Sequence, residues 1–260
     1  MPPPRLPRMS FDVAAEAYDR FMGRYSAPLA EVFADFAQLP EGGRALDVGC
    51  GTGALTSVLA RRYGESEVAA VDPSASFVDA VAKRLPWADV RHGHAEDLPF
   101  DDHVFAATLA ELVVHFMADP IAGVREMRRV THPGGVIAAC VWDFQGGRAP
   151  QSRFFAALRE ATGSADDESD RAGAGAGQLA ALLEASGCTD VVEGEVSVTR
   201  SFDGFDEWWE PFTLGVAPAG RQLAGLEDSE REKVRTSARA LFPTGPFTVD
   251  VTAWAARGIA

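Results

Sequence analysis

The residues best suited to hold a ligand are the glycines of the segment Ala45–Thr56, which reads ALDVGCGTGALT. An apolar run leads into Gly49, and Gly51 and Gly53 follow before a helical pattern begins. Glycines let the main chain turn sharply and let a ligand approach it closely. The N-terminus of the following helix offers N–H groups to an anionic or polar ligand. The segment therefore predicts a ligand site beyond the carboxyl ends of parallel strands.

Asp47 and Asp72 help to distinguish a dinucleotide from S-adenosylmethionine as the ligand. The spacing Gly49-x-Gly51-x-x-Ala54 also satisfies a dinucleotide-binding pattern, so it leaves NAD open. Asp72 ends the second apolar run, where a carboxylate accepts hydrogen bonds from ribose hydroxyls of either ligand. Asp47 lies beside the loop, where it would repel a pyrophosphate and attract an ammonium group. S-adenosylmethionine carries an adenosine, an ammonium and a sulfonium but no phosphate, so it fits both aspartates.

Four sequence blocks follow one another between about Ala45 and Trp142. They are ALDVGCGTG, VAAVDPS, GHAEDLPFDDHVFAATLAELVVHFMADP and REMRRVTHPGG. One glycine motif is a weak signal, whereas four blocks in the right order are specific. Together they resemble the class I S-adenosylmethionine-dependent methyltransferases, in the group that includes the quinone-biosynthesis C-methyltransferases. The segments AYDRFMGRYS and FDEWWEPFTLGVAPAG also look like uncharacterised bacterial members of this group.

The resemblance implies which residues hold S-adenosylmethionine. The main chain at Gly49 and Gly51 would hold the methionine part, with Asp47 near its amino group, and Asp72 would hold the ribose. The other residues implied in cofactor binding are Tyr18 and Arg24 in the N-terminal helices, Pro73, His94, Ala95, Glu96 and Ala110. Family members usually carry an Asp where this chain has His94, and that Asp reaches the adenine amino group. An imidazole nitrogen can accept from the same amino group, so the departure bears on cofactor affinity.

The resemblance also implies that Ala110 to His115 faces the sulfonium and the acceptor. His115 is the first candidate for a general base and Glu111 the second, and a base is needed only where the acceptor must lose a proton. The family pattern usually ends in two histidines, and Phe116 replaces the second. A buried, hydrogen-bonded histidine is the alternative reading of His115. Four aromatic side chains could line the acceptor site: Phe144, Trp208, Trp209 and Phe212. They predict a small apolar or aromatic acceptor, and the alternative is that they form a packed core.

Apolar runs that alternate with helical patterns predict an α/β protein with a mostly parallel sheet. We expect strands near residues 44–48, 68–71, 89–92, 103–109, 136–142, 191–202 and 247–255. The expected architecture is a Rossmann-like seven-stranded, mostly parallel sheet with an antiparallel last strand, as in the resembled family. A single domain 1–260 would comprise N-terminal cap helices at 10–43, a cofactor-binding half at 44–142 and a helical lid insertion at 203–246. The acidic run 166–170 is expected to be a solvated loop.

The composition narrows the classes of protein and partner. Of 260 residues, 47% are hydrophobic and 24% charged, which excludes a disordered or fibrous chain. The net charge of −14 disfavours nucleic acid as a partner. The longest apolar run is too short to span a bilayer and no signal peptide is recognisable, so we expect a cytoplasmic protein without a membrane partner. Three distant cysteines and scattered histidines predict neither disulfides nor a metal site.

Two other functions stay open at this stage. An NAD-dependent oxidoreductase on a similar fold is the first, although Asp47 and the PGG block speak against it. A non-catalytic S-adenosylmethionine-binding module is the second, for which His94 and Phe116 leave room. The partner is expected to be a small-molecule methyl acceptor. The sequence leaves open the acceptor atom (O, N, C or S) and the oligomeric state.

Overall fold

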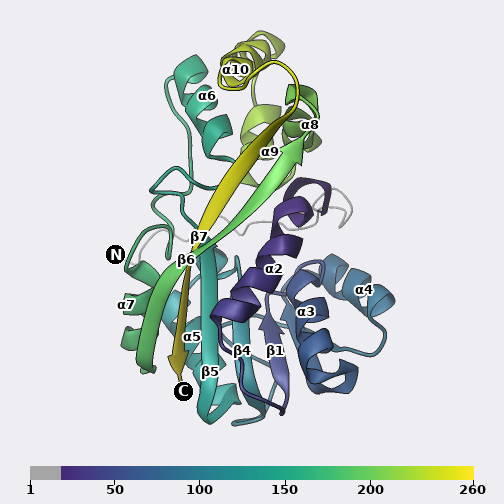
Figure 1. The fold of residues 1–260 in the computed structure, drawn as a ribbon, viewed down its shortest axis with the longest axis vertical. Coiled ribbons are helices and arrows are strands. Elements are labelled where there is room, and N and C mark those ends of the chain that lie inside the picture. The colour runs from purple at the N-terminus through teal and green to yellow at the C-terminus, as the bar shows by residue number, and fades with distance from the viewer. Residues whose placement is uncertain (1–18) are drawn as a thin grey trace.

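The computed structural model describes residues 19–260 (Figure 1). Tyr18 and the first part of the expected N-terminal helices lie outside this range. The seven strands form one sheet in the order β3-β2-β1-β4-β5-β7-β6. They are β1 (Ala45–Val48), β2 (Val68–Asp72), β3 (Asp89–His92), β4 (Phe105–Glu111), β5 (Thr131–Trp142), β6 (Thr189–Phe202) and β7 (Phe247–Ile259).

The direction of the strands confirms the expected topology. β1 to β5 pair in parallel, and β7 lies antiparallel between β5 and β6. Every residue of β1 and β2 is buried, as parallel strands covered on both faces require. In register, Asp47 pairs with Ala70 on one side and Leu109 on the other. The carboxyl ends of β2, β1 and β4 therefore meet at one edge, where the glycine segment begins.

Helices cover both faces of this sheet, with α2 in front and α5 and α7 behind it in Figure 1. α2 contacts α3 and β6, and α5 contacts α7. The elements before β6 are η1 (Asp19–Gly23), α2 (Arg24–Phe36), α3 (Ala54–Tyr63), η2 (Glu65–Glu67), α4 (Ala75–Arg84), η3 (Val114–Phe116), α5 (Pro120–Val130), α6 (Ser152–Thr162) and α7 (Gln178–Ala185). Among residues 19–260, no helix combines the length and the apolar character needed to cross a membrane.

β6 and β7 extend beyond the other strands as a long two-stranded ribbon, with a group of helices at its far end (Figure 1). The insertion between them consists of α8 (Phe205–Trp209), η4 (Glu210–Leu214), α9 (Ala217–Ala224) and α10 (Asp228–Ala240). α6 packs against α10, so the region after β5 joins the same group. At the end of the ribbon, the rings of Phe202 and Phe247 stack with centroids 5.4 Å apart. The helical insertion before the last strand is thus confirmed.

Several strand ends differ from the sequence prediction, and two of them, in β5 and β4, bear on the site. β5 begins at Thr131, five residues before the predicted start at Val136, because Thr131 pairs with Phe105 across a register irregularity. β4 continues to Glu111 instead of ending at Leu109, since its last residues pair with β5 as far as Cys140. Ala110 and Glu111 are therefore strand residues whose positions are fixed by the sheet.

Candidate functional site

The glycine segment joins β1 to α3 through two backbone positions of different character. Gly49 has φ +72°, and a Cβ added there would lie 2.4 Å from Cγ2 of Val113. Conformation and space therefore both exclude other residues at Gly49. Gly51 has φ +51°, but a Cβ there would meet nothing within 4 Å. The main chain at Gly51 consequently borders open space that a ligand can enter.

The N–H groups of this loop already have partners inside the protein. Gly49 and Cys50 donate to the carbonyl oxygen of Val71 at 2.7 and 3.0 Å. Gly51 donates to Oδ2 of Asp72 at 2.9 Å. A phosphate at a helix N-terminus is held by free N–H groups, and these three are not free. The loop therefore favours a ligand without phosphate, as the position of Asp47 also does.

Three carboxyl groups gather at the ends of β1, β2 and β4. Asp47 is 1% exposed and accepts a hydrogen bond from Oγ1 of Thr56 at 2.6 Å; burial and the charge of Asp72 raise its pKa to about 7. Burial and the charge of Asp47 raise the pKa of Glu111 well above its usual range. Within residues 19–260, no cationic side chain is paired with Asp47, and Oε1 of Glu111 has no partner. A cationic ligand would stabilise the ionised carboxylates, so the site fits the ammonium and sulfonium of S-adenosylmethionine.

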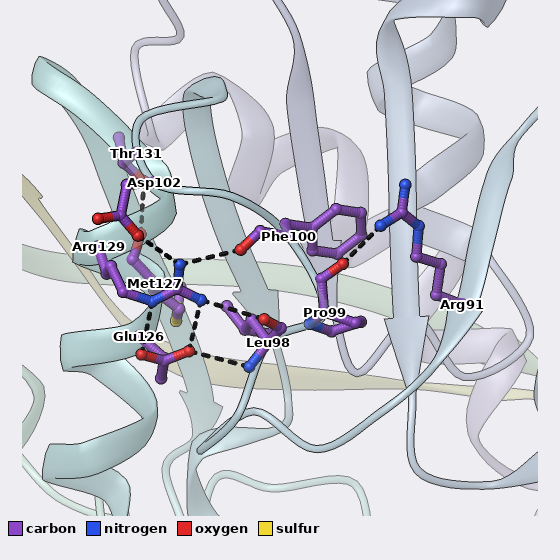
Figure 2. A network of polar contacts seen from close by, with 9 residues as sticks. All are labelled: Arg91, Leu98, Pro99, Phe100, Asp102, Glu126, Met127, Arg129 and Thr131. Carbon is purple, nitrogen blue, oxygen red and sulfur yellow. Dashed lines mark hydrogen bonds and ion pairs between the residues drawn. The ribbon is translucent and has the colours of Figure 1, made fainter.

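The segment that follows β3 carries the predicted adenine-side residues, and α5 holds it in place. The guanidinium of Arg129 uses all five of its N–H groups there (Figure 2). Its acceptors are the carboxylates of Glu126 and Asp102, at 2.7–2.8 Å, and the main-chain oxygens of Phe100 and Leu98, at 2.9 and 3.1 Å. Arg129, from the block REMRRVTHPGG, thus fixes the position of the segment Leu98–Asp102, which belongs to the block beginning GHAEDLPF.

Within this segment, the side chains differ in their surroundings. Oε1 of Glu96 accepts from the N–H groups of Ala118 and Asp119, at 2.7 and 3.3 Å, and so fixes the approach to α5. These two bonds commit Oε1 of Glu96 to the protein and leave Oε2 and the main chain for the predicted cofactor contact. His94 is exposed with its ring 6.4 Å from that of His92, and Ala95 is buried. The roles of His94, Ala95 and Glu96 toward adenine stay predictions.

Asp72 and Pro73 end the second strand beside this segment. Asp72 is 5% exposed and accepts from the N–H of Ser74 at 2.8 Å as well as from the loop. Pro73 is exposed, and its carbonyl oxygen lies 3.0 Å from Nε2 of His92. The predicted ribose and adenine-face residues therefore lie next to the glycine loop. The structure places them at the same edge of the sheet as Asp47, Gly49, Gly51 and Ala110, and their contact with a cofactor stays a prediction.

After β4 the chain turns sharply at Leu112, whose φ of +60° is unusual for a branched residue. The N–H of Leu112 donates to the oxygen of Cys140 at 2.9 Å, and the next residue, Val113, lies against Gly49. His115 follows, 5% exposed, with its ring centroid 3.9 Å from that of Phe116. Strained turns of this kind are concentrated at functional sites.

Neither predicted base has a pKa that favours the role. Burial and the charge of Arg171 lower the pKa of His115 to about 3, so its imidazole is neutral near pH 7 but a weak base. Burial and the charge of Asp47 raise the pKa of Glu111 well above its usual range. A general base is most effective when its pKa lies near the working pH. Catalysis by His115 or Glu111 stays a prediction.

Two buried polar residues near His115 escaped the sequence analysis. Glu168 and Gln151 are each 3% exposed, and Nε2 of Gln151 donates to Oε2 of Glu168 at 3.2 Å. The prediction that 166–170 is a solvated loop is therefore wrong at Glu168. No periodic pattern surrounds Glu168 in the run DDESD, so the sequence offers no signal for its burial.

The predicted acceptor-side aromatics are placed in two groups. Trp208, Trp209 and Phe212 are at most 7% exposed and belong to an aromatic cluster in which Phe212 stacks on Phe154 at 4.5 Å. This cluster is a packed core of the helical region. Phe144 lies apart from it, with its ring centroid 5.7 Å from that of His115. Of the four, only Phe144 is brought next to a predicted catalytic residue.

Arg24 points its guanidinium toward the helical region. Its Nη1 donates to the carbonyl oxygen of Glu207 at 3.2 Å, and its Nε donates to that of Arg20 at 2.9 Å. Both contacts tie α2 to its neighbours, and neither involves the glycine loop. The predicted contact of Arg24 with the cofactor carboxylate stays untested, as does the role of Tyr18.

The three cysteines are free thiols in separate places. Cys50 lies in the glycine loop, Cys140 in β5 and Cys188 just before β6, and all three are buried. Burial raises the pKa of each thiol, for Cys188 to about 11. In the described part of the chain, no three His, Cys, Asp or Glu side chains are grouped so as to hold a metal ion.

A Rossmann-like sheet with buried carboxyl groups around a glycine loop defines the class: an α/β protein with a nucleoside-type ligand site at its strand ends. Residues 46–139 match the profile of a family described as "Methyltransferase domain". Over this segment the chain is similar to the class I S-adenosylmethionine-dependent methyltransferases, and the match supports that family.

Curated relatives agree with this match over about half of the chain. A malonyl-[acyl-carrier protein] O-methyltransferase of Halorhodospira halophila is 34% identical over 139 residues, 51% of this chain and 46% of that protein. A 2-phytyl-1,4-naphtoquinone methyltransferase of Thermosynechococcus vestitus is 33% identical over 142 residues, 52% and 62% of the two chains. This chain thus spans about half the length of the curated relatives it matches.

Similarity of fold extends over nearly the whole chain. A Thermotoga maritima structure, described as an S-adenosylmethionine-dependent methyltransferase and possible histamine N-methyltransferase, has a TM-score of 0.56. It covers 94% of this chain and 95% of its own, at 18% identity. At that identity, the likeness concerns the fold and not the acceptor.

Proposed function

We propose that the protein transfers a methyl group from S-adenosylmethionine to a small-molecule acceptor. The observation that carries the proposal is the group of buried carboxyls at the ends of β1, β2 and β4, of which Asp47 and Glu111 have no cationic partner in the described chain. The open space at Gly51 and the internally bonded loop N–H groups favour a cationic ligand that lacks phosphate.

Each part of the cofactor is assigned to a different residue of the site. Asp47 would hold the ammonium group, the main chain at Gly51 the methionine part, and Asp72 the ribose hydroxyls. The segment at Ala95 would border the adenine. When bound, S-adenosylmethionine supplies a methyl group on a sulfonium, whose positive charge is lost as the methyl leaves. Glu111 at the end of β4 would lie on the side of that charge.

The protein's contribution to the reaction is mainly alignment and exclusion of water. Correct placement of two reactants contributes about 7–11 kcal/mol in favourable cases. The segment Leu112–Phe116 and Phe144 border the acceptor side, which gives the acceptor apolar and aromatic surroundings. The named relatives are a malonyl-[acyl-carrier protein] O-methyltransferase and a 2-phytyl-1,4-naphtoquinone methyltransferase. Similarity to this family therefore leaves the acceptor open, and a small, largely apolar or aromatic molecule agrees with these surroundings.

Thermal unfolding in the presence of four ligands tests the proposal. S-adenosylmethionine and S-adenosylhomocysteine at a hundred times their Kd should each add about 2.7 kcal/mol to the free energy of unfolding. NAD and NADP should leave it unchanged. A shift with NAD alone would replace the proposal by the oxidoreductase alternative. A shift with the adenosyl compounds but no methyl transfer to any acceptor in a broad panel would favour the non-catalytic binding module.

A further inference from the structure

A small cavity lies beside the segment Leu112–Phe116. Val113 of this segment contacts Gly49, whereas Leu112 and His115 line the cavity. Its other walls come from η1, β5, η3, the start of α6, the loop before α7 and the start of α9; they include Met22, Phe116, Trp142, Gln151, Glu168 and Pro218. One short stretch of chain therefore separates the cavity from the proposed methyl-donor site.

The cavity measures about 20 Å³. A cavity needs about 10–15 Å³ to hold one water molecule. The space therefore suits a group of the size of water, such as a hydroxyl or an amino group, and not a whole substrate molecule. Met22, Leu112, Phe116 and Pro218 make the rest of the wall apolar.

Unpaired polar atoms are concentrated around this space. Seven buried side-chain nitrogen or oxygen atoms lack a hydrogen-bond partner within residues 19–260, and four of the seven belong to residues that line the cavity. The four are Nδ1 of His115, Nε1 of Trp142, Oε1 of Gln151 and Oε1 of Glu168. An unpaired buried polar atom costs about 1–3 kcal/mol. So many around one small space indicate that a ligand group completes their hydrogen bonds.

The acceptor atoms among them are held in a fixed arrangement. The amide nitrogen of Gln151 donates to Oε2 of Glu168, which leaves Oε1 of each side chain for another donor. Glu168 itself has φ +65°, a conformation unusual for a residue other than glycine. The main-chain N–H of Arg171 donates to its carbonyl oxygen at 3.1 Å, which closes the local turn. Backbone strain and carboxyl burial at one residue are both costs to folding, and ligand binding accounts for them.

We propose that Oε1 of Gln151 and Oε1 of Glu168 bind an O–H or N–H group of the methyl acceptor. The inference rests on the proposed function, because it assigns this cavity to the acceptor of that reaction. The acceptor is then a neutral or cationic molecule with a hydrogen-bond donor on an apolar body. A carboxylate in the same place would meet the two acceptor oxygens and is disfavoured above about pH 7, where Glu168 is ionised.

A series of benzyl compounds tests this recognition by binding alone. Benzyl alcohol and benzylamine carry the donor group, ethylbenzene replaces it by a methyl group, and benzoate carries an anion. Affinities are measured by ligand-observed NMR on the protein saturated with S-adenosylhomocysteine. The alcohol and the amine should bind at least tenfold more tightly than ethylbenzene and benzoate. Equal binding of ethylbenzene and benzyl alcohol to the unaltered protein would overturn the inference.

Variants assign the preference to the two residues. Glu168→Gln and Gln151→Leu should each reduce the preference for benzyl alcohol over ethylbenzene to less than threefold. Asp170→Asn, which changes an exposed acid two residues away, should leave the preference unchanged. Persistence of the preference in both cavity variants would overturn the assignment. So would a crystal structure grown with benzyl alcohol that shows a water molecule alone between the two oxygens.

The failure of this inference and of the proposed function are distinguishable. Calorimetry with S-adenosylhomocysteine on the unaltered protein tests the proposed function first. Binding of the adenosyl compound without discrimination in the benzyl series would overturn only the acceptor site. If the adenosyl compound does not bind, both fall, since the cavity is assigned to an acceptor of methyl transfer.

Discussion

The cofactor side and the acceptor side of this site treat their buried polar groups in opposite ways. On the cofactor side, Asp72 accepts from the N–H groups of Gly51 and Ser74, and Asp47 accepts from Thr56. On the acceptor side, Gln151 and Glu168 contact each other and leave one oxygen each unpaired. Asp72 and Asp47 are thus held by hydrogen bonds within the protein, whereas Gln151, Glu168 and, at the end of β4, Glu111 each keep an oxygen for a ligand.

Loss of the Trp208 ring should have the largest effect on stability. It also tests whether the cofactor side keeps its affinity when the aromatic cluster of the helical region is disrupted. Trp208 is 2% exposed and packs on Phe242 with ring centroids 4.4 Å apart. Trp208→Ala should lower the free energy of unfolding by about 3–5 kcal/mol, because it leaves a large cavity. Denaturant unfolding measures this loss, and calorimetry should show an affinity for S-adenosylhomocysteine within threefold of the unaltered protein. A loss above tenfold would mean that the aromatic cluster supports the cofactor side directly.

The Asp72 carboxylate offers the next largest effect. Asp72→Ala leaves the N–H groups of Gly51 and Ser74 without their acceptor, and each buried unpaired group costs about 1–3 kcal/mol. We expect unfolding free energy to fall by about 2–4 kcal/mol and S-adenosylmethionine affinity to fall at least a hundredfold. Asp79→Ala removes an exposed acid from the following helix and serves as the control. An affinity retained within fivefold would show that Asp72 does not hold the ribose.

The charge on Asp47 should make cofactor binding depend on pH. Its pKa of about 7 in the ligand-free protein means that a cationic ligand must bind the ionised form at the expense of the protonated one. Affinity for S-adenosylmethionine should therefore be about tenfold lower at pH 6 than at pH 8, with release of a proton on binding. Asp47→Asn should remove most of this dependence, as titration calorimetry in two buffers would show.

The Asp47 carboxyl group should also make the stability of the ligand-free protein depend on pH. Stability should fall as the pH rises, whereas cofactor affinity should increase. The folded-state pKa of Asp47 lies above its ordinary value of 3.8, so the folded protein binds the proton more tightly than the unfolded chain. The stability from this proton is fully present below about pH 4 and is lost as the pH rises through about 7. A ligand-free protein in which Asp47→Asn leaves this part of the pH profile unchanged would contradict the assignment of that pKa.

His115 offers a direct comparison of the two sides. His115→Ala should lower turnover by about tenfold or more if the imidazole takes a proton, while affinity for S-adenosylhomocysteine changes less than twofold. Because burial lowers its pKa to about 3, the turnover of the unaltered protein should show no inflection from His115 between pH 5 and 9. Equal turnover of the two proteins at saturating acceptor would assign His115 to packing alone.

The arrangement of the strand ends that carry the predicted cofactor residues followed from the sequence. Gly49, Gly51 and Asp72 follow strands whose apolar runs are recognisable, and parallel strands place their carboxyl ends at one edge. The insertion before β7 and the antiparallel last strand were also correct. The start of β5 was missed because the run Pro-Gly-Gly resembles a loop. The first residue of β5, Thr131, nevertheless pairs with Phe105 of β4.

The acceptor side could not be predicted in the same way. Gln151 and Glu168 come from two segments without a shared pattern, and only the packing of α6 against the following loop makes them neighbours. Glu96 illustrates a related limit: its sequence position indicates the cofactor, but its carboxylate binds the main chain before α5. Sequence spacing identifies where a side chain lies along an element, but not which donor it reaches.

The three buried thiols can be used to measure local opening of the fold at three places. A thiol reagent reacts with the thiolate, so Cys50, Cys140 and Cys188 are protected as long as they stay buried with raised pKa values. Their labelling rates, resolved by peptide mass spectrometry, would measure separately how often the glycine loop, the central strand and the base of the β6–β7 ribbon open. An adenosyl ligand bound at the loop should slow the labelling of Cys50 far more than that of Cys188.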